Sequence, residues 1–154
     1  MTIFLLGINM NTLKRNAIVP YSARQMFELV DNIEEYPRFL PWCHTSHIIS
    51  RTEKEVIASL EIMWKGIHKS FTTRNVLHPY QQMDINLENG PLKHLEGIWH
   101  FQALHDRGCK VTLDLEFEFA GGFIDRLFQP VFKHIANTLV EAFCKRAAEL
   151  YGQE

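Results

Sequence analysis

Residues 111–119, VTLDLEFEF, constrain the fold most, because apolar and polar side chains alternate there without a break. Successive side chains of a β-strand point to opposite faces of its sheet. One face of this segment is therefore entirely apolar, and it carries Val111, Leu113, Leu115, Phe117 and Phe119. A sheet that is dry on one side and wet on the other is typical of antiparallel strands.

The same alternation recurs along most of the chain. It predicts further strands over residues 12–19, 56–64, 67–77, 82–87 and 95–103. Pro20 ends the first of these strands, and Lys65-Gly66 predicts a tight turn between two of the others.

Two short helices are predicted between the first strand and the rest. Ser22 followed by Gln25 is a capping box and opens a helix of about ten residues. Asn32 with Glu35 repeats that pattern for a very short second helix, which Pro37 interrupts.

A long helix over residues 124–151 closes the chain after Gly121-Gly122. Its apolar stripe has helical spacing and consists of Phe128, Val131/Phe132, Ile135, Leu139, Phe143 and Leu150. The order of elements predicts an α+β fold, in which this helix covers the dry face of a curved antiparallel sheet of about six or seven strands. We expect one domain over residues 11–152, preceded by a tail or an upstream start over residues 1–10, whose MTIFLLGI run is too short to span a bilayer.

Composition excludes two classes of protein. The net charge is −2 and no run of basic residues is longer than two, which argues against a general nucleic-acid binder. The three cysteines are widely spaced and odd in number, which indicates free thiols in a reducing compartment and not a disulfide framework.

The dry face is rich in aromatic side chains, while Ala58 and Gly97 leave gaps in it. A filled core and a lined ligand cavity both fit this pattern, since ligand pockets are mostly apolar with few polar groups. Periodicity alone does not separate the two.

The segment YPRFLPWCHTSH, residues 36–47, concentrates aromatics, prolines, a cysteine and histidines. Its aromatic side chains suit a cap over a cavity or the docking of a short helix onto the sheet. A zinc site is disfavoured, because Cys43 and His44 point apart in a strand and no second pair of ligands has metal-like spacing. His94 and His100 fall on the wet face, where we expect them to be solvated.

A catalytic role is also disfavoured by the pattern. The carboxylates of the predicted strands alternate outward, whereas acid–base catalysis needs titratable groups inside a cleft. Lys69 and Asn75 share the strand parity of Phe71 and are the polar residues expected nearest a cavity. We therefore expect a binding protein with no catalytic residue and no metal.

Two motifs, YPRFLPWC at residues 36–43 and GPLKHLEGIW at residues 90–99, carry a family resemblance that extends over residues 11–152. The chain resembles the coenzyme-Q-binding, polyketide-cyclase-like branch of the START superfamily, and within it the bacterial ribosome-association toxins. The resemblance implies a helix-grip fold, in which the sheet and the long helix enclose an elongated hydrophobic tunnel.

The resemblance also implies bound ubiquinone or another lipid with no required cofactor, support of respiratory electron transport, and transient contact with a membrane surface. For the toxins it implies binding to the large ribosomal subunit, which blocks subunit joining. A polyketide cyclase or aromatase is the third functional hypothesis. The expected location is the cytoplasm, with peripheral contact at the inner membrane.

On this reading the ligand contacts come from the cap segment, the dry face and the long helix. The expected residues are Tyr36, Phe39, Pro41, Trp42, Trp64, Phe71, Leu95, Trp99, Phe101, Leu115, Phe117, Phe119, Phe128, Phe132, Ile135 and Leu139.

Overall fold

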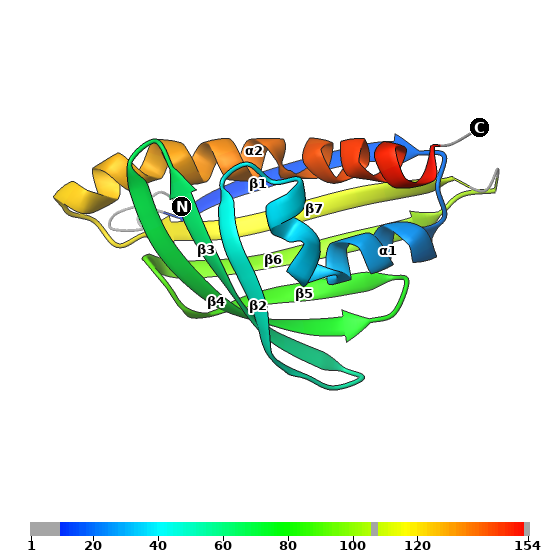
Figure 1. Cartoon of the computed structure of the whole chain (residues 1–154), viewed down its shortest axis with the longest axis horizontal. Helices are drawn as coiled ribbons and strands as arrows, with labels where there is room; N and C mark the ends of the chain where they lie inside the picture. The colour runs from blue at the N-terminus through cyan, green and yellow to red at the C-terminus, as the bar shows by residue number, and fades with distance from the viewer. Residues whose placement is uncertain (1–9, 106–107, 153–154) are drawn as a thin grey trace, which may run out of the picture.

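The predicted strands pair into one antiparallel sheet, which a computed structural model describes for residues 10–105 and 108–152 (Figure 1). The elements are β1 (Met10–Val19), α1 (Ala23–Asp31), the 3-10 helix η2 (Ile33–Arg38), β2 (Cys43–Arg51), β3 (Glu55–Trp64), β4 (Ile67–His78), β5 (Gln82–Asn89), β6 (Leu92–Ala103), β7 (Cys109–Phe119) and α2 (Phe123–Tyr151). Met10 already pairs with Glu118, so the strand begins inside the predicted tail. Residues 1–9 lie outside the described residues.

The strand order across the sheet is β1-β7-β6-β5-β4-β3-β2. The fold class predicted from the sequence is therefore confirmed, including the curved antiparallel sheet and the closing helix. The alternation did not predict β2, because this edge strand is mostly exposed and has no dry face for apolar residues to mark.

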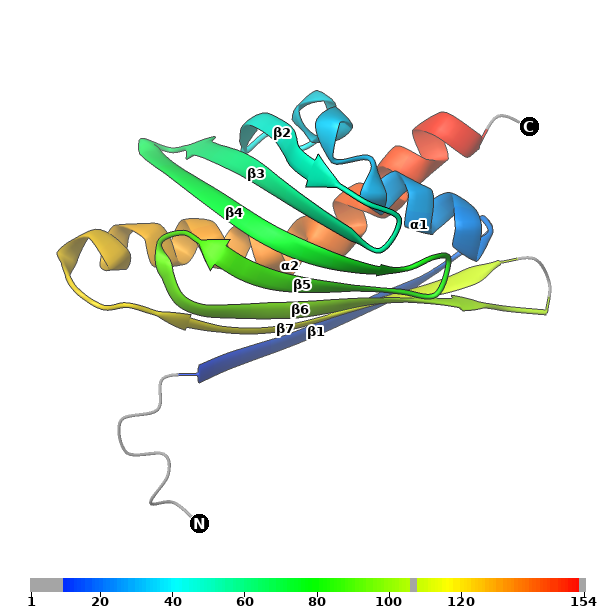
Figure 2. The same cartoon turned by 90° about the horizontal axis from the view of Figure 1, so that it is seen from below.

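Helix α2 lies along the concave side of the sheet, where it contacts β1, β7 and β4 (Figures 1 and 2). Figure 2 shows β2, β3 and β4 rising from the floor that β1, β7, β6 and β5 form, so the sheet curves around the helix. Helix α1 contacts β6, β7 and α2, and η2 packs on β2.

Local sequence signals account for the connections. Ser22 caps α1 through its side-chain oxygen, and Gln25 returns a hydrogen bond to the Ser22 backbone, as the capping box predicts. Lys65 and Gly66 both have positive φ, 51° and 83°, which is the backbone of a two-residue hairpin turn. The predicted cap of the second helix is wrong, because the Asn32 side chain makes no capping bond and η2 tolerates Pro37 as a 3-10 helix.

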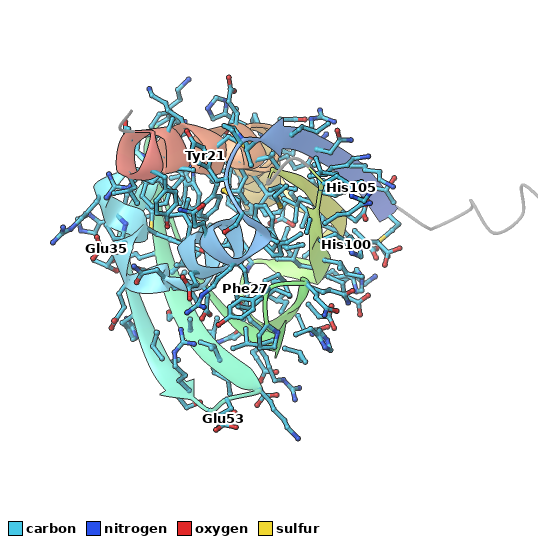
Figure 3. The ribbon with its side chains drawn as sticks, turned by 90° about the vertical axis from the view of Figure 1, so that its right-hand side faces the viewer. Tyr21, Phe27, Glu35, Glu53, His100 and His105 are labelled. Atoms are coloured by element: carbon cyan, nitrogen blue, oxygen red, sulfur yellow. The ribbon has the colours of Figure 1, made fainter. Side chains whose placement is uncertain are left out.

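The buried side chains form two clusters at opposite ends of α2. One gathers around α1, Trp99 and Phe143, and the other around Phe71, Phe117 and Phe128. Figure 3 looks along the molecule from the α1 end, with Phe27 under α1, His100 on the outer side of β6 and Glu53 at the tip of the β2–β3 hairpin. The predicted stripe of α2 is correct except at Leu150, which is 46% exposed.

Candidate functional site

An apolar cavity of about 140 Å³ lies between the two clusters, bounded by the sheet, α2 and the segment around η2. Its lining consists of Ile33, Tyr36, Trp42, Ala58, Leu60, Ile62, Phe71, Thr73, Asn75, Ile85, Leu95, Trp99, Leu113, Leu115, Phe132, Ile135, Ala136, Leu139 and Phe143. The cavity is close in size to an engineered apolar cavity of about 150 Å³ that binds benzene. It therefore has room for a ring-sized molecule.

More than half of the residues expected to contact a ligand do line this cavity. They are Tyr36, Trp42, Phe71, Leu95, Trp99, Leu115, Phe132, Ile135 and Leu139. Of the remaining lining residues, those in β3 to β7 share the dry-face parity of their strands, so alternation marks them as inward-facing without marking them as cavity walls. Ala136 and Phe143 follow the apolar stripe of α2 in the same way.

Four of the residues expected to contact a ligand do not line the cavity. Three of them pack against other side chains, and one is exposed. Phe101 packs edge-on against Phe27 with ring centroids 5.5 Å apart. Trp64 stacks on His134 at 5.8 Å, and Phe39 packs between Phe143 and the Arg146 guanidinium, which lies 5.3 Å from its ring. Pro41 is exposed.

The other three, Phe117, Phe119 and Phe128, pack at the end of the cavity nearest the start of α2. With Phe71 and Phe132 they form a phenylalanine cluster, in which ring centroids are 4.9–6.4 Å apart. Such distances are those of favourable edge-on and tilted aromatic pairs. The cluster closes the space in which the resemblance implies an elongated tunnel, so the cavity is shorter than expected.

The two predicted gaps have different outcomes. Ala58 does line the cavity. The gap at Gly97 is filled, because a methyl carbon of Leu115 lies only 2.7 Å from where a side-chain carbon on Gly97 would stand.

Three polar side chains reach the lining: Tyr36, Thr73 and Asn75. The Tyr36 hydroxyl donates a hydrogen bond to the Val30 carbonyl, so it holds η2 to α1 and does not point its proton at a ligand. Burial raises the pKa of this phenol, which keeps it protonated. Lys69, the other polar residue expected near the cavity, is not among the lining residues.

The residues of the cap segment that were weighed as zinc ligands form no metal-binding group among the described residues. Cys43 is buried and its thiol donates to the Thr45 carbonyl, while His44 and His47 are exposed. Burial raises the pKa of Cys43 to about 12, so this thiol stays protonated.

On the outer face, two carboxylates gather around His94, which the sequence predicts to be only solvated. His94 lies 3.2 Å from a Glu116 carboxylate oxygen and 3.9 Å from one of Glu96, and the ligand atoms of these three residues could hold a metal ion. His100 pairs in the same way with Asp114 at 3.7 Å. Contacts between imidazole and carboxylate groups on neighbouring strands account for both arrangements. The cross-strand register of alternating polar positions in β6 and β7 brings these groups together.

Comparison with known proteins places this geometry in a family. Residues 19–144 match the family described as polyketide cyclase / dehydrase and lipid transport. The chain belongs to this family. Its sheet and helix superpose on an aromatase/cyclase, Zhui from Streptomyces sp. R1128, with a TM-score of 0.79 at 16% identity, covering 90% of this chain and 93% of the other.

Two relatives with different names match most of this chain. Ribosome association toxin RatA of Pseudomonas aeruginosa is 45% identical over 140 residues, covering 91% of this chain and 97% of the toxin. Coenzyme Q-binding protein COQ10 homolog B of Xenopus laevis is 28% identical over 154 residues, covering 97% of this chain and 63% of that protein. The resemblance read from the two sequence motifs is therefore confirmed. No helix among the described residues combines the length and apolar character needed to cross a membrane.

Proposed function

We propose that this protein associates with the ribosome, binding the large subunit and blocking subunit joining in the cytoplasm. The observation that carries the proposal is the match to a ribosome association toxin at 45% identity over 97% of that protein's length. The quinone-binding relative is more distant, at 28% identity, and this chain spans only 63% of it.

The charge distribution supports a particular contact surface. On the outer face of the sheet, most cations pair with carboxylates, as Lys14 does with Asp114 and Lys93 with Glu118. The exposed side of α2 differs, because Arg126, Lys133 and Lys145 are exposed and have no ion pair among the described residues. Exposed cations that have no carboxylate partner suit contact with ribosomal RNA phosphates.

A sucrose-gradient profile of cells expressing the protein tests this proposal. The wild type is expected to shift particles from joined ribosomes to separate subunits. The triple variant R126E/K133E/K145E is expected to lose the shift, while Lys54→Glu, an exposed change in the β2–β3 turn, keeps it as the matched control. A profile that the wild-type protein leaves unchanged refutes ribosome association.

A second function, binding of an apolar molecule, is favoured by the cavity itself. The polar side chains of its lining are a tyrosine, a threonine and an asparagine, none of which exchanges a proton near neutral pH, which supports binding over acid–base catalysis. An isoprenoid quinone is the first candidate ligand, given the name of the Xenopus relative. Its ring fits about 140 Å³, whereas its tail requires the phenylalanine cluster to move.

Organic extraction of the purified protein followed by mass spectrometry tests the second function. We expect a co-purifying apolar molecule in stoichiometric amount, which is absent from the Ala136→Leu protein because the added side chain occupies the cavity. Equal amounts from both proteins would place the molecule elsewhere.

A further inference from the structure

Asn75 is the one polar side chain of the cavity lining that is almost completely buried, with 4% of its surface exposed. It lies in β4, where the neighbouring strands hold it in register with Val56 on one side and Ile85 on the other. The ladder on both sides fixes the strand, and with it the face of the sheet to which this side chain points. The amide therefore faces the cavity by construction of the fold.

The hydrogen bonds of this amide are incomplete. The Thr73 hydroxyl donates to Asn75 Oδ1 at 3.0 Å. The amide nitrogen carries two further donors, and no described residue accepts a hydrogen bond from it. The Nε atom of Arg146 is fully enclosed by other atoms and has no hydrogen-bond partner. The amide nitrogen of Asn75 differs from it, because it retains contact with free space. The free donors of Asn75 thus open onto the cavity.

A buried donor without a partner destabilises a fold, and an apolar side chain at position 75 would avoid that cost. Apart from Thr73 and Tyr36, the walls around it are aliphatic and aromatic side chains, and the Tyr36 hydroxyl is engaged by Val30. A ligand that satisfies the amide must bring its own acceptor. The volume of about 140 Å³ limits such a ligand to roughly one or two fused rings.

We infer that Asn75 is the polar recognition point of the cavity, and that the ligand is a compact apolar ring compound whose carbonyl oxygen accepts a hydrogen bond from the Asn75 amide. Thr73 is a positioning residue, since its hydroxyl holds Oδ1 and so turns the amide nitrogen toward the ligand. This inference rests on the proposed ligand-binding function and adds to it the class of ligand and the residue that selects it.

Indane and 1-indanone have nearly equal shapes and differ by one carbonyl group. The difference between their affinities therefore measures the contribution of the carbonyl to binding. Trp42 and Trp99 line the cavity, so tryptophan fluorescence reports binding of either probe. In Asn75→Leu, the affinity for 1-indanone is expected to fall about five- to tenfold relative to any change for indane, the usual effect of one lost hydrogen bond. Thr73→Val, which keeps the amide but frees its orientation, is expected to lose part of that preference.

A measurement on the wild-type protein guards against a variant that does not fold. The side-chain amide proton signals of Asn75 in a ¹⁵N-edited NMR spectrum are expected to move further downfield with 1-indanone than with indane, because only 1-indanone accepts a hydrogen bond. Equal effects of the two probes on both the affinities and the spectrum would overturn the role of Asn75 while leaving apolar binding intact. Binding of neither probe to the wild type would overturn the inference together with the ligand-binding function.

Discussion

Replacing Ala136 with leucine is the sharpest test of whether the space under α2 is a true cavity. Ala136 is 1% exposed and lines the cavity from the helix side, in contact with the cluster around Phe132 and Ile135. Alanine and leucine have similar helix propensities, so the backbone of α2 contributes little to the outcome. The three added carbons have nowhere to go except into the cavity.

The expected magnitude follows from the volume. Cavity volume costs about 24 cal/mol per Å³. If the leucine fills roughly half of the 140 Å³, it returns about 1.7 kcal/mol. Ordering its side chain costs about 0.5–1 kcal/mol. The net gain is about 1 kcal/mol in the free energy of unfolding, which raises Tm by about 2–4 °C for a chain of this length.

Urea denaturation followed by far-UV circular dichroism measures this gain, and 1-indanone titration shows whether the ligand is excluded. Ala58→Leu, on the opposite wall of the cavity, is the matched variant and is expected to behave in the same way. A loss of more than about 1 kcal/mol in both variants is the signature of overpacking. That result would mean that the space is already filled, and it would refute the cavity.

Three other substitutions or conditions test the packing, the helix cap and the buried thiols. Phe128→Ala removes a fully buried ring from the phenylalanine cluster and is expected to cost about 4 kcal/mol, seen as a lower urea midpoint. Ser22→Ala removes the side-chain acceptor that caps α1 and is expected to cost about 1 kcal/mol in the same assay, with a return toward wild type in Ser22→Asp. Burial raises the pKa of Cys43 to about 12 and of Cys109 to about 11, from an ordinary 9.0. The thiols therefore ionise at lower pH in the unfolded chain than in the folded one. The stability that they contribute is complete below pH 9 and falls as the pH rises toward 12. Unfolding curves that do not change across this window would contradict the burial of the thiols.

The sequence predicted the fold well because buried positions recur at a regular spacing along a strand or helix. Every strand with one dry face was found from that spacing. Strand β2 was missed because it is mostly exposed and its apolar residues show no such spacing. The capping box at Ser22 was found from two residues, whereas Asn32 shows the same residue pattern without the bond. A local signal identifies a helix start only when the backbone beyond it continues as an α-helix.

The site was predicted less well because alternation reports direction and not free volume. Phe71 and Phe117 both face inward and both belong to the phenylalanine cluster, yet only Phe71 also borders the cavity. Gly97 suggested a gap, but Leu115 from the next strand occupies it. The free volume beside an inward-facing residue depends on side chains from several strands and from α2. The sequence of a single segment therefore does not predict it.

Helix α2 connects the two proposed functions, since it presents opposite sides to the cavity and to solvent. Ala136 lies on the buried side, and Lys145, nine residues later, lies on the opposite, exposed side. A side chain that fills the cavity leaves the exposed cations in place, so ribosome association and ligand binding are separable by mutation as long as α2 keeps its position. An Ala136→Leu protein that excludes the ligand and still separates the ribosomal subunits would show that the two functions are independent. Loss of both in a stable protein would mean instead that the ligand sets the position of α2, because the substitution leaves Arg126, Lys133 and Lys145 unchanged.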